Sequence, residues 1–338
     1  MNSNLETACQ VVHNTFGDPA SVLRVSAAHR PASPADGEVL VRVTHSAIHR
    51  GDLHLVTGTY AGKRGQSTDG PRVPGLEAVG VVTEAASATL AASGLEIGAR
   101  VAFFAPDAWQ SWRVLPAAAL VPVPAQIPDD IAAQMLINSI TALHVLRQAS
   151  AVHANVQTII QTGAASAVSK LITHFALQRG ISPIRLVRSE QSADVLRSVL
   201  PGGAVISISQ PDWRDQVREH ASGELALAFD CVSGDMIGEL SDLMADSATI
   251  MSYGALDDSP AATAKLMNRG QRLQGVTVGH WFGAAAKQQH ADIGQALEVA
   301  RNHPELFGHA DQFEVGDLSS AISAVTAPSK SGNVLIKF

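Results

Sequence analysis

A run of small residues between a strand-like and a helix-like segment carries the strongest chemical signal of this chain. Segment 156–161 has the β-branched bulk of a buried parallel strand. Residues 162–165 (TGAA) then carry almost no side chain, so a phosphate could approach their backbone closely. From Ser166 apolar residues recur at helical spacing until Gly180, which we expect to end the helix in a left-handed conformation. Together with the strand that follows, this order predicts a βαβ unit whose helix N-terminus receives a pyrophosphate. The expected contacts are Gly163, Ala165, Ser166, Ala167 and Val168.

The end of the second strand, 184–188, indicates which dinucleotide would bind. An acidic residue at this point would bind the ribose 2′-hydroxyl of NAD, whereas Arg188 suits a 2′-phosphate, to which Ser189 can also donate. The residues therefore favour NADPH as the cofactor. Two alternatives stay open. Glu190 could bind the ribose hydroxyls of NAD, or the turn could belong to another doubly wound protein, since the complete G-x-G-x-x-G pattern is absent.

Composition narrows the class of protein. The chain has 338 residues, enough for two domains, and no apolar run reaches the roughly 20 residues of a membrane span. The formal net charge of -7 argues against a nucleic-acid surface. Cys9 and Cys231 are the only cysteines and lie far apart, which excludes a disulfide framework. The first ten residues lack the pattern of a signal or transit peptide, so we expect a cytoplasmic protein that binds neither membrane nor nucleic acid.

Three regions of the chain differ in character. Residues 1–125 hold short β-type runs broken by Gly and Pro (EVLVRVT, AVGVVT, RVAFFA), which predicts a barrel-like β domain. In 126–286 strands alternate with helices, which predicts a doubly wound parallel sheet in an α/β protein. The tail, 287–338, returns to helix and then to a strand, 333–338, that we expect to rejoin the sheet of the first domain. The candidate strands of the second domain are 156–161, 184–188, 204–208, 225–231, 248–253 and 273–279.

Nearly the whole chain also shows an ordered series of longer motifs. They are EVLVRVTHSAIHRGDLH (38–54), TGTY (57–60), VPGLEAVGVV (73–82), LINSITALHVL (136–146), IIQTGAASAVSKLI (159–172), LVRSE (186–190), LALAFDCVSGD (225–235), TIMSYGAL (249–256) and LQGVTVGHW (273–281). The series resembles the medium-chain dehydrogenases/reductases, above all the zinc-independent 2-enoyl thioester reductases and the related quinone oxidoreductases. The resemblance implies a GroES-like domain, 1–125 with 287–338, and an NADP-binding Rossmann domain, 126–286, with NADPH in the cleft between them.

The resemblance further implies catalytic residues. Tyr60 lies in TGTYAG, which is similar to a family loop whose tyrosine protonates the substrate as hydride arrives. A phenol with a pKa near about 10 is protonated at neutral pH and can donate. Asn138 and Thr141 match a segment beneath the nicotinamide ribose, where both could bond the cofactor or the proton donor. Alternatively, Tyr60 only lines the cleft, and Asn138 and Thr141 are helix N-caps. The other cofactor contacts that the resemblance implies are Tyr253, Gly254, Ala255, Leu256, Val276, Val278 and Asn333, the last at the position of a family lysine.

The zinc ligands of related enzymes have no counterpart in the sequence. Zinc-dependent members of the superfamily place a cysteine near 46–50 and a histidine within a Gly-His-Glu triplet. Here the triplet has Leu76 at its centre, which cannot ligate metal. We therefore expect no metal, although His45, His49 and His54 lie close together in sequence.

The sequence thus predicts an NADPH-dependent oxidoreductase that delivers hydride to the β-carbon of an activated alkene, either a 2-enoyl thioester or an enone. An NADPH quinone oxidoreductase is the alternative enzyme, and a redox-inactive NADPH-binding protein is the alternative of another class. Loop 61–74 is longer than in the enoyl reductases, and its basic residues could meet an anionic substrate or simply be solvated.

Family members commonly form homodimers through the last Rossmann strand, here near 273–281, whose apolar bulk would lie at that edge. The alternative is a monomer in which this strand is simply core. The edge residues are Val276, Val278, Trp281 and Phe282.

Overall fold

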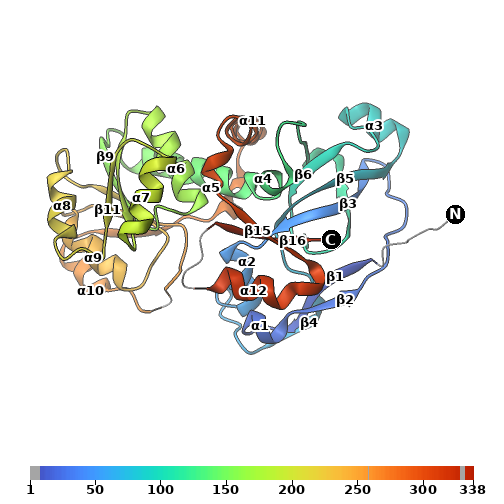
Figure 1. Cartoon of the computed structure of the whole chain (residues 1–338), viewed down its shortest axis with the longest axis horizontal. Helices are drawn as coiled ribbons and strands as arrows, with labels where there is room; N and C mark the ends of the chain where they lie inside the picture. Colours follow the sequence, from blue (N-terminus) through green and yellow to red (C-terminus); the bar gives the residue numbers. More distant parts are fainter. Residues whose placement is uncertain (1–7, 258, 328–331) are drawn as a thin grey trace. The chain divides into compact units, whose positions relative to one another are not determined.

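The computed structural model describes residues 8–257, 259–327 and 332–338 (Figure 1). The chain forms two compact units. The β unit contains the chain up to residue 137 and residues 296–338, and the parallel-sheet unit contains residues 138–295. The substrate-binding and NADP-binding roles that the sequence assigned to its two domains stay predictions. Within the described ranges, no helix is both long and apolar enough to cross a membrane.

The β unit is organised by a seven-stranded sheet. Its order is β15-β16-β3-β5-β6-β8. β7 pairs with the N-terminal half of β3, from Glu38 to Arg42. β16 pairs antiparallel with β3, with Leu335 opposite Ala47, which confirms that the C-terminal strand rejoins this sheet. The sequence had not predicted β15, which runs parallel to β16 at the sheet edge. The strands are β3 (Glu38–Ala47), β5 (Glu77–Ala85), β6 (Arg100–Phe104), β7 (Trp112–Pro116), β8 (Leu120–Pro122), β15 (Ala310–Glu314) and β16 (Asn333–Lys337).

A second, three-stranded sheet in the β unit contains part of segment 61–74, which the sequence predicts to be a loop. β1 (Cys9–Thr15) lies between β2 (Arg24–Ala27) and β4 (Ser67–Arg72). The sequence of β4, STDGPR, has little strand preference, since Thr68 is its only residue of a type enriched in strands. It becomes a strand because β1 supplies the backbone partners, with Thr15 opposite Ser67 and His13 opposite Arg72. The helices of this unit are α1 (Pro19–Val22), α2 (Arg50–Thr57), α3 (Ser87–Ser93), α4 (Asp129–Ala132) and α12 (Leu318–Thr326).

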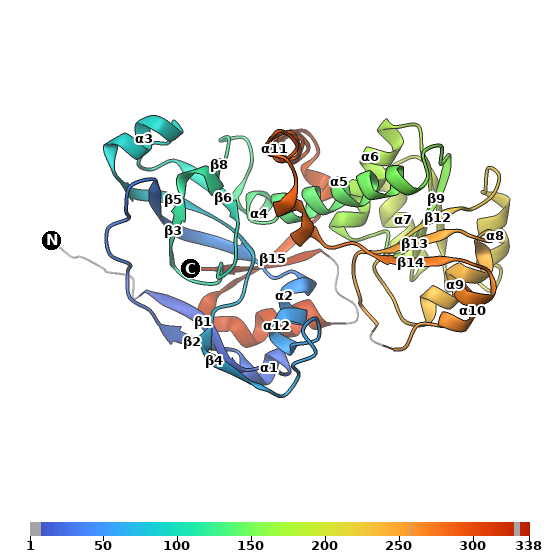
Figure 2. The same cartoon turned by 180° about the vertical axis from the view of Figure 1, so that it is seen from behind.

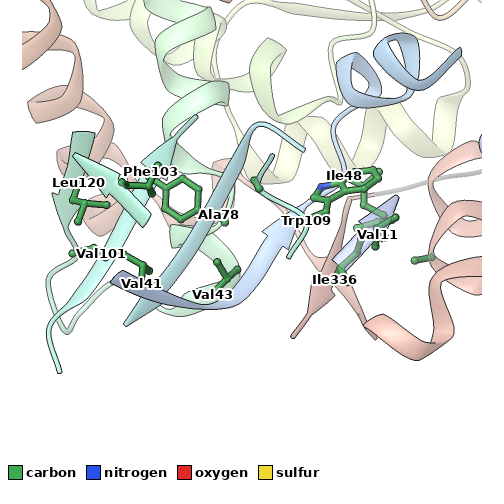
Figure 3. Close-up of a cluster of buried hydrophobic side chains, with 14 of the residues drawn as sticks. Val11, Val41, Val43, Ile48, Ala78, Val101, Phe103, Trp109, Leu120 and Ile336 are labelled. Atoms are coloured by element: carbon green, nitrogen blue, oxygen red, sulfur yellow. The ribbon is translucent and has the colours of Figure 1, made fainter. Parts of the chain in front are cut away.

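Trp109 belongs to the hydrophobic core of the β unit, where it lies beside Ile48 and Val11 (Figure 3). Its indole is fully buried, and its Nε1 donates a hydrogen bond of 3.0 Å to the carbonyl of Ala47 at the end of β3. Gly75 is needed beside it, because a Cβ on Gly75 would lie 2.2 Å from the indole ring and its φ is +91°. This packing fixes the chain just before β5, where Glu77 begins the strand.

The parallel-sheet unit confirms the predicted Rossmann-type architecture (Figure 2). Its six strands are all parallel, in the order β11-β10-β9-β12-β13-β14. The strands are β9 (Thr158–Gln161), β10 (Ser182–Val187), β11 (Ala204–Ser207), β12 (Leu227–Asp230), β13 (Thr249–Ser252) and β14 (Arg272–Gly275). Helices connect them: α6 (Ala167–Gln178), α7 (Glu190–Val199), α8 (Trp213–Glu219), α9 (Asp235–Leu243) and α10 (Thr263–Asn268). Two longer helices, α5 (Met135–Val152) and α11 (Ala286–Asn302), begin in one unit and end in the other.

The last predicted strand, 273–279, is wrong at its C-terminal end. β14 stops at Gly275, and a 3-10 helix, η2, spans Val278–Gly283. The side chain of Thr277 caps that helix, because its Oγ1 accepts a hydrogen bond of 3.3 Å from the amide of Gly279. The apolar pattern of this segment therefore belongs to a strand end followed by a capped turn.

Candidate active site

The turn after β9 has the structure that the sequence predicted. Gly163 has a φ of +53°, and the small residues Ala165 and Ser166 at the tip are exposed. Ser166 caps α6, since its Oγ accepts a hydrogen bond of 3.2 Å from the amide of Ser169. The amides of Ala167 and Val168 in the first helical turn have no hydrogen-bond partner within the described residues. A pyrophosphate fits this end of α6, because free amides and the helix dipole both attract an anion.

A buried carboxylate holds the base of this turn. Thr162 Oγ1 donates 2.7 Å to Asp230 Oδ1 at the end of β12 and accepts 3.0 Å from the amide of Cys231. The Asp230 carboxylate also accepts from the amides of Val232 (3.1 Å) and Ser233 (2.9 Å). Burial raises the pKa of Asp230, and these hydrogen bonds oppose that shift. The network ties the ends of β9 and β12 together below the turn.

The close contact between Gly163 and Cys231 explains why a glycine stands here. A Cβ on Gly163 would lie 2.4 Å from Cys231 Sγ, well inside contact distance. Burial raises the pKa of the Cys231 thiol to about 11, so it is protonated at neutral pH and is not a nucleophile. Cys231 therefore acts as a small buried side chain that packs under the turn.

Tyr253, which the sequence placed in a turn over the cofactor, has its hydroxyl directed to α6. The phenolic oxygen lies 2.7 Å from Ser169 Oγ, and burial raises the pKa of Tyr253 well above its usual value. Gly254 packs on Cys231, where an added Cβ would be 3.1 Å from the cysteine Cβ. Ala255 follows half-buried, and Leu256 is exposed. The hydroxyl of Tyr253 thus supports the first turn of α6.

Two residues after β10, the cation Arg188 and the acid Glu190, are the candidates for contact with the cofactor ribose. Arg188 is exposed, and Ser189 caps α7 by accepting 3.3 Å from the amide of Ser192. Glu190 is already engaged, since its Oε1 accepts 3.2 Å from Gln210 Nε2 and its Oε2 lies 3.9 Å from an Arg197 nitrogen. Arg188 as the group that meets the ribose 2′-phosphate stays a prediction.

In the β unit, Tyr60 lies just beyond α2, which ends at Gly58 in a left-handed conformation. The Tyr60 side chain is 60% exposed, and its ring centroid is 5.0 Å from that of His54. Desolvation and the negative charge of Asp52 both raise the pKa of the Tyr60 phenol. Tyr60 is therefore an accessible phenol that keeps its proton at neutral pH.

A cluster of three titratable side chains, which sequence reasoning missed, lies at the start of α2. His49 Nε2 is 2.8 Å from Glu77 Oε2, and Glu77 is fully buried. Glu77 Oε1 also accepts from the amides of Leu136 (2.5 Å) and Ile137 (3.2 Å), which fixes the beginning of α5. Asp52 Oδ2 accepts 2.8 Å from the amide of His49. Local spacing signals only the pair His49 and Asp52 at the start of α2, because Glu77 comes from β5, 28 positions further along the chain.

The three neighbouring histidines of the sequence do not converge. His49 contacts Glu77, His54 stacks near Tyr60, and His45 Nδ1 lies 3.8 Å from Asp129 Oδ2. Among the residues that can be described, no three His, Cys, Asp or Glu side chains are grouped so that they could hold a metal ion. The expectation of a metal-free site stays a prediction.

Asn138 and Thr141 lie inside α5 and are both buried. Because α5 begins at Met135, neither residue is the N-cap that the alternative interpretation required. Their proposed contacts with the cofactor or the proton donor stay predictions.

The remaining predicted contacts lie in segments with partners of their own. Val276 is buried, and its amide donates 2.8 Å to the carbonyl of Ser252, while Val278 begins η2. Asn333 Nδ2 donates 2.6 Å to the carbonyl of Phe307, which joins the start of β16 to the segment before β15.

Trp281 was expected at an exposed sheet edge, and that expectation is wrong. Its ring is buried, and its Nε1 donates 2.9 Å to Asp292 Oδ2, whose other oxygen pairs with Arg147 at 2.6 Å. Phe282, by contrast, is 53% exposed. The hydrogen bond to the buried Asp292 carboxylate thus holds Trp281 inside this unit.

Comparison with known proteins agrees with this arrangement. Residues 35–125 match the alcohol dehydrogenase GroES-like domain. The chain is 28% identical over 288 residues to the mitochondrial enoyl-acyl-carrier-protein reductase of Dictyostelium discoideum, covering 82% of this chain and 78% of that protein.

Solved structures show the same fold over almost the full length. A quinone oxidoreductase of Pseudomonas syringae has a TM-score of 0.81 at 22% identity, covering 98% of this chain and 100% of that one. The Escherichia coli quinone oxidoreductase complexed with NADPH has a TM-score of 0.80 at 18% identity, again covering 98% and 100%. The family model covers the GroES-like β unit alone, whereas the solved structures match the fold of both units. This chain is therefore similar over most of its length to an enoyl-acyl-carrier-protein reductase in sequence and to quinone oxidoreductases in fold.

Proposed function

We propose that this protein is an NADPH-dependent reductase that delivers hydride to the β-carbon of an activated alkene, either a 2-enoyl thioester or an enone. The curated relative from Dictyostelium discoideum is an enoyl-acyl-carrier-protein reductase, and the similarity spans most of both chains. Tyr60 is the proposed donor of the proton that the neighbouring carbon must receive.

The parallel-sheet unit supports NADPH as the cofactor. The free amides of Ala167 and Val168 suit the pyrophosphate, and the exposed Arg188 suits a 2′-phosphate. When bound, NADPH supplies the hydride. The same cofactor is present in the Escherichia coli quinone oxidoreductase that shares this fold.

The single observation that carries the proposal is the state of Tyr60. Its side chain is exposed, and desolvation together with the charge of Asp52 raises its pKa, so the hydroxyl is protonated at neutral pH. Reduction of a carbon–carbon double bond needs a proton at the α-carbon, and a protonated phenol can donate it. An accessible, protonated phenol is therefore the group that alkene reduction requires.

Quinone reduction is the second candidate, favoured by the solved structures of the same fold that are quinone oxidoreductases. Such a reaction needs no placed donor, because quinone oxygens can take protons from water. The two candidates differ in their dependence on the Tyr60 hydroxyl.

The test follows NADPH oxidation with crotonyl-CoA and with naphthoquinone, in the wild-type protein and in Tyr60→Phe. Removal of a general acid typically lowers the rate by about 10²–10⁴-fold, so we expect that loss for crotonyl-CoA and little change in NADPH affinity. Naphthoquinone turnover, if present, should survive. Wild-type crotonyl-CoA reduction in Tyr60→Phe would rule out Tyr60 as the donor. Turnover of neither substrate by the wild-type protein would favour a redox-inactive NADPH-binding protein.

We also propose that the protein is a homodimer paired through β14. This strand is the last of the sheet order and pairs with β13 alone among the described strands, and Leu273 on it is 42% exposed. A cytoplasmic location remains a proposal, since the curated relative from Dictyostelium discoideum is named mitochondrial. Cell fractionation with an antibody to the full chain would decide between the two compartments.

A further inference from the structure

A cavity of about 600 Å³ lies within the parallel-sheet unit, between the second half of α5, η2 and the start of α11. Its volume falls in the range of small-molecule sites, roughly 300–1,000 Å³. The described residues that line it include none of the cofactor contacts predicted from the sequence, so it is a candidate site of its own. Its lining combines the glycines and alanines of segment 279–285 with five polar side chains: His144, Arg147, Gln148, His280 and Gln288.

His144 on α5 is the group that points to a ligand. Only 6% of it is exposed, and neither of its ring nitrogens has a hydrogen-bond partner among the residues that the structure describes. Buried polar groups in native proteins are nearly always paired, because an unpaired one has lost its hydration without any compensation. Since His144 lines the cavity, a molecule bound there can supply the missing partner.

Arg147, one turn further along α5, is held in a fixed position at the same cavity. Its Nη2 donates 2.6 Å to Asp292 Oδ1, and the Asp292 side chain is 1% exposed. The same carboxylate accepts 2.9 Å from Gln288 Nε2 and 2.9 Å from Trp281 Nε1. A guanidinium has five N–H donors, enough to bind a second carboxylate besides Asp292.

The charges around His144 indicate how much negative charge the cavity can accept. Burial, followed by the charges of Arg147 and His280, lowers the pKa of His144, and Asp292 opposes this shift. The ring is therefore neutral at neutral pH, and a bound anion would favour its protonated form. The charge of Arg147 is already balanced by Asp292, so protonation of His144 matches one further negative charge. A dianion would leave a charge uncompensated near the buried Asp292 carboxylate.

We propose that this cavity binds a small organic monocarboxylate. The carboxylate group accepts hydrogen bonds from His144 and Arg147, and the apolar body of the ligand packs against the glycines and alanines of segment 279–285. This site goes beyond the proposed reductase function and does not depend on it.

The experiment measures binding of 4-fluorobenzoate to the full chain by fluorine NMR, with 4-fluorobenzamide as a neutral probe of the same shape. We expect the benzoate to bind at least about 10-fold more tightly than the benzamide, the effect of a charge-assisted hydrogen bond. His144→Phe keeps an aromatic ring and removes both nitrogens, so it should weaken benzoate binding by about 10- to 100-fold. Because those nitrogens have no partner among the described residues, the variant should unfold in urea no earlier than the wild-type protein. His220→Phe makes the same change at an exposed position and should leave binding unchanged.

The pH dependence of binding gives a second measurement, which uses the wild-type protein. Benzoate stays ionised between pH 6 and 8, and its binding raises the pKa of His144, so a proton is taken up on binding. Affinity should therefore fall as the pH rises through this range. His144→Phe should lose this dependence, and His280→Ala should keep it, because His280 is exposed and its charge is screened by solvent.

Four results would overturn the proposal: equal binding of benzoate and benzamide, absence of benzoate binding, wild-type affinity in His144→Phe, and affinity that does not change with pH. Tighter binding of 4-fluorophenyl phosphate than of 4-fluorobenzoate would overturn it in favour of a phosphate ligand. Displacement of the benzoate by NADPH would also overturn it, because the cavity would then be part of the cofactor site. If His144→Phe fails to fold, the comparison of benzoate with benzamide and the pH dependence in the wild-type protein still decide.

Discussion

Asp52 allows a stability prediction that can be worked from the structure. It is fully buried at the start of α2, where one carboxylate oxygen accepts a hydrogen bond from the amide of His49 and the other, Oδ1, has no partner among the residues described. Burial raises the pKa of Asp52 from 3.8 to about 6, even though His49 favours the charged form. At neutral pH the fold therefore contains an ionised carboxylate that would be better solvated in the unfolded chain.

The size and sign of the effect follow from proton linkage. Between pH 3.8 and about 6 the folded state binds more protons at Asp52 than the unfolded state, so this residue makes stability fall as pH rises through that window. A shift of about 2 pH units corresponds to a penalty of about 3 kcal/mol above pH 6, at 1.36 kcal/mol per unit. Below pH 3.8 the penalty vanishes, because both states are protonated.

Asp52→Asn removes the charge and keeps an oxygen that can accept from the His49 amide. We expect the free energy of unfolding at pH 7.5 to rise by about 1–3 kcal/mol, the lower value applying if the new amide nitrogen finds no acceptor. The gain should shrink as the pH is lowered and disappear near pH 4. Urea unfolding, followed by tryptophan fluorescence and by circular dichroism at a series of pH values, measures the gain in the free energy of unfolding and its dependence on pH.

The exposed residue Asp36 offers a matched control, since Asp36→Asn changes the same charge at a solvated position and should leave stability within about 0.5 kcal/mol. A variant Asp52→Asn that is no more stable than wild type at pH 7.5 would refute the reasoning. A gain that is the same at pH 4 and pH 7.5 would also refute it, because a gain of that kind could not come from the carboxylate charge.

Further predictions concern the cofactor, the turn, the metal and the assembly. Arg188→Ala should weaken NADPH binding by about 10- to 100-fold and leave NADH nearly unchanged, as measured by fluorescence titration; equal weakening of both would contradict the 2′-phosphate contact. Gly163→Ala should lower the free energy of unfolding by about 1–3 kcal/mol, because the new methyl group would lie 2.4 Å from Cys231 Sγ and the φ of residue 163 is +53°. Chemical denaturation measures this loss, and an unchanged free energy of unfolding would contradict the steric conflict with Cys231. Elemental analysis should find no stoichiometric zinc, and one zinc per chain would refute the argument from Leu76. Light scattering should give twice the chain mass of 35.3 kDa, and the monomer mass at micromolar concentration would exclude pairing through β14.

The sequence predicted the fold well wherever one local pattern determines one element. All six strands of the parallel sheet lie within or close to the predicted segments, because short runs that alternate with helical segments leave few other structures. The prediction was wrong at 273–279, where a threonine cap follows the strand, and it missed β4 and β15. Those two strands have weak strand patterns of their own and form because β1 and β16 supply their backbone partners.

For the candidate site, the sequence alone determined the small-residue turn at Gly163, the cation at Arg188 and the phenol at Tyr60, because each depends on residue type at one position in a recognisable motif. Only the tertiary structure decided what supports them. Thr162 meets Asp230 across 68 positions, Ser169 meets Tyr253 across 84, and His49 meets Glu77 across 28. Hydrogen bonds between side chains so far apart in sequence leave no periodicity along the chain. They exist because the fold buries polar groups that must then be paired with one another.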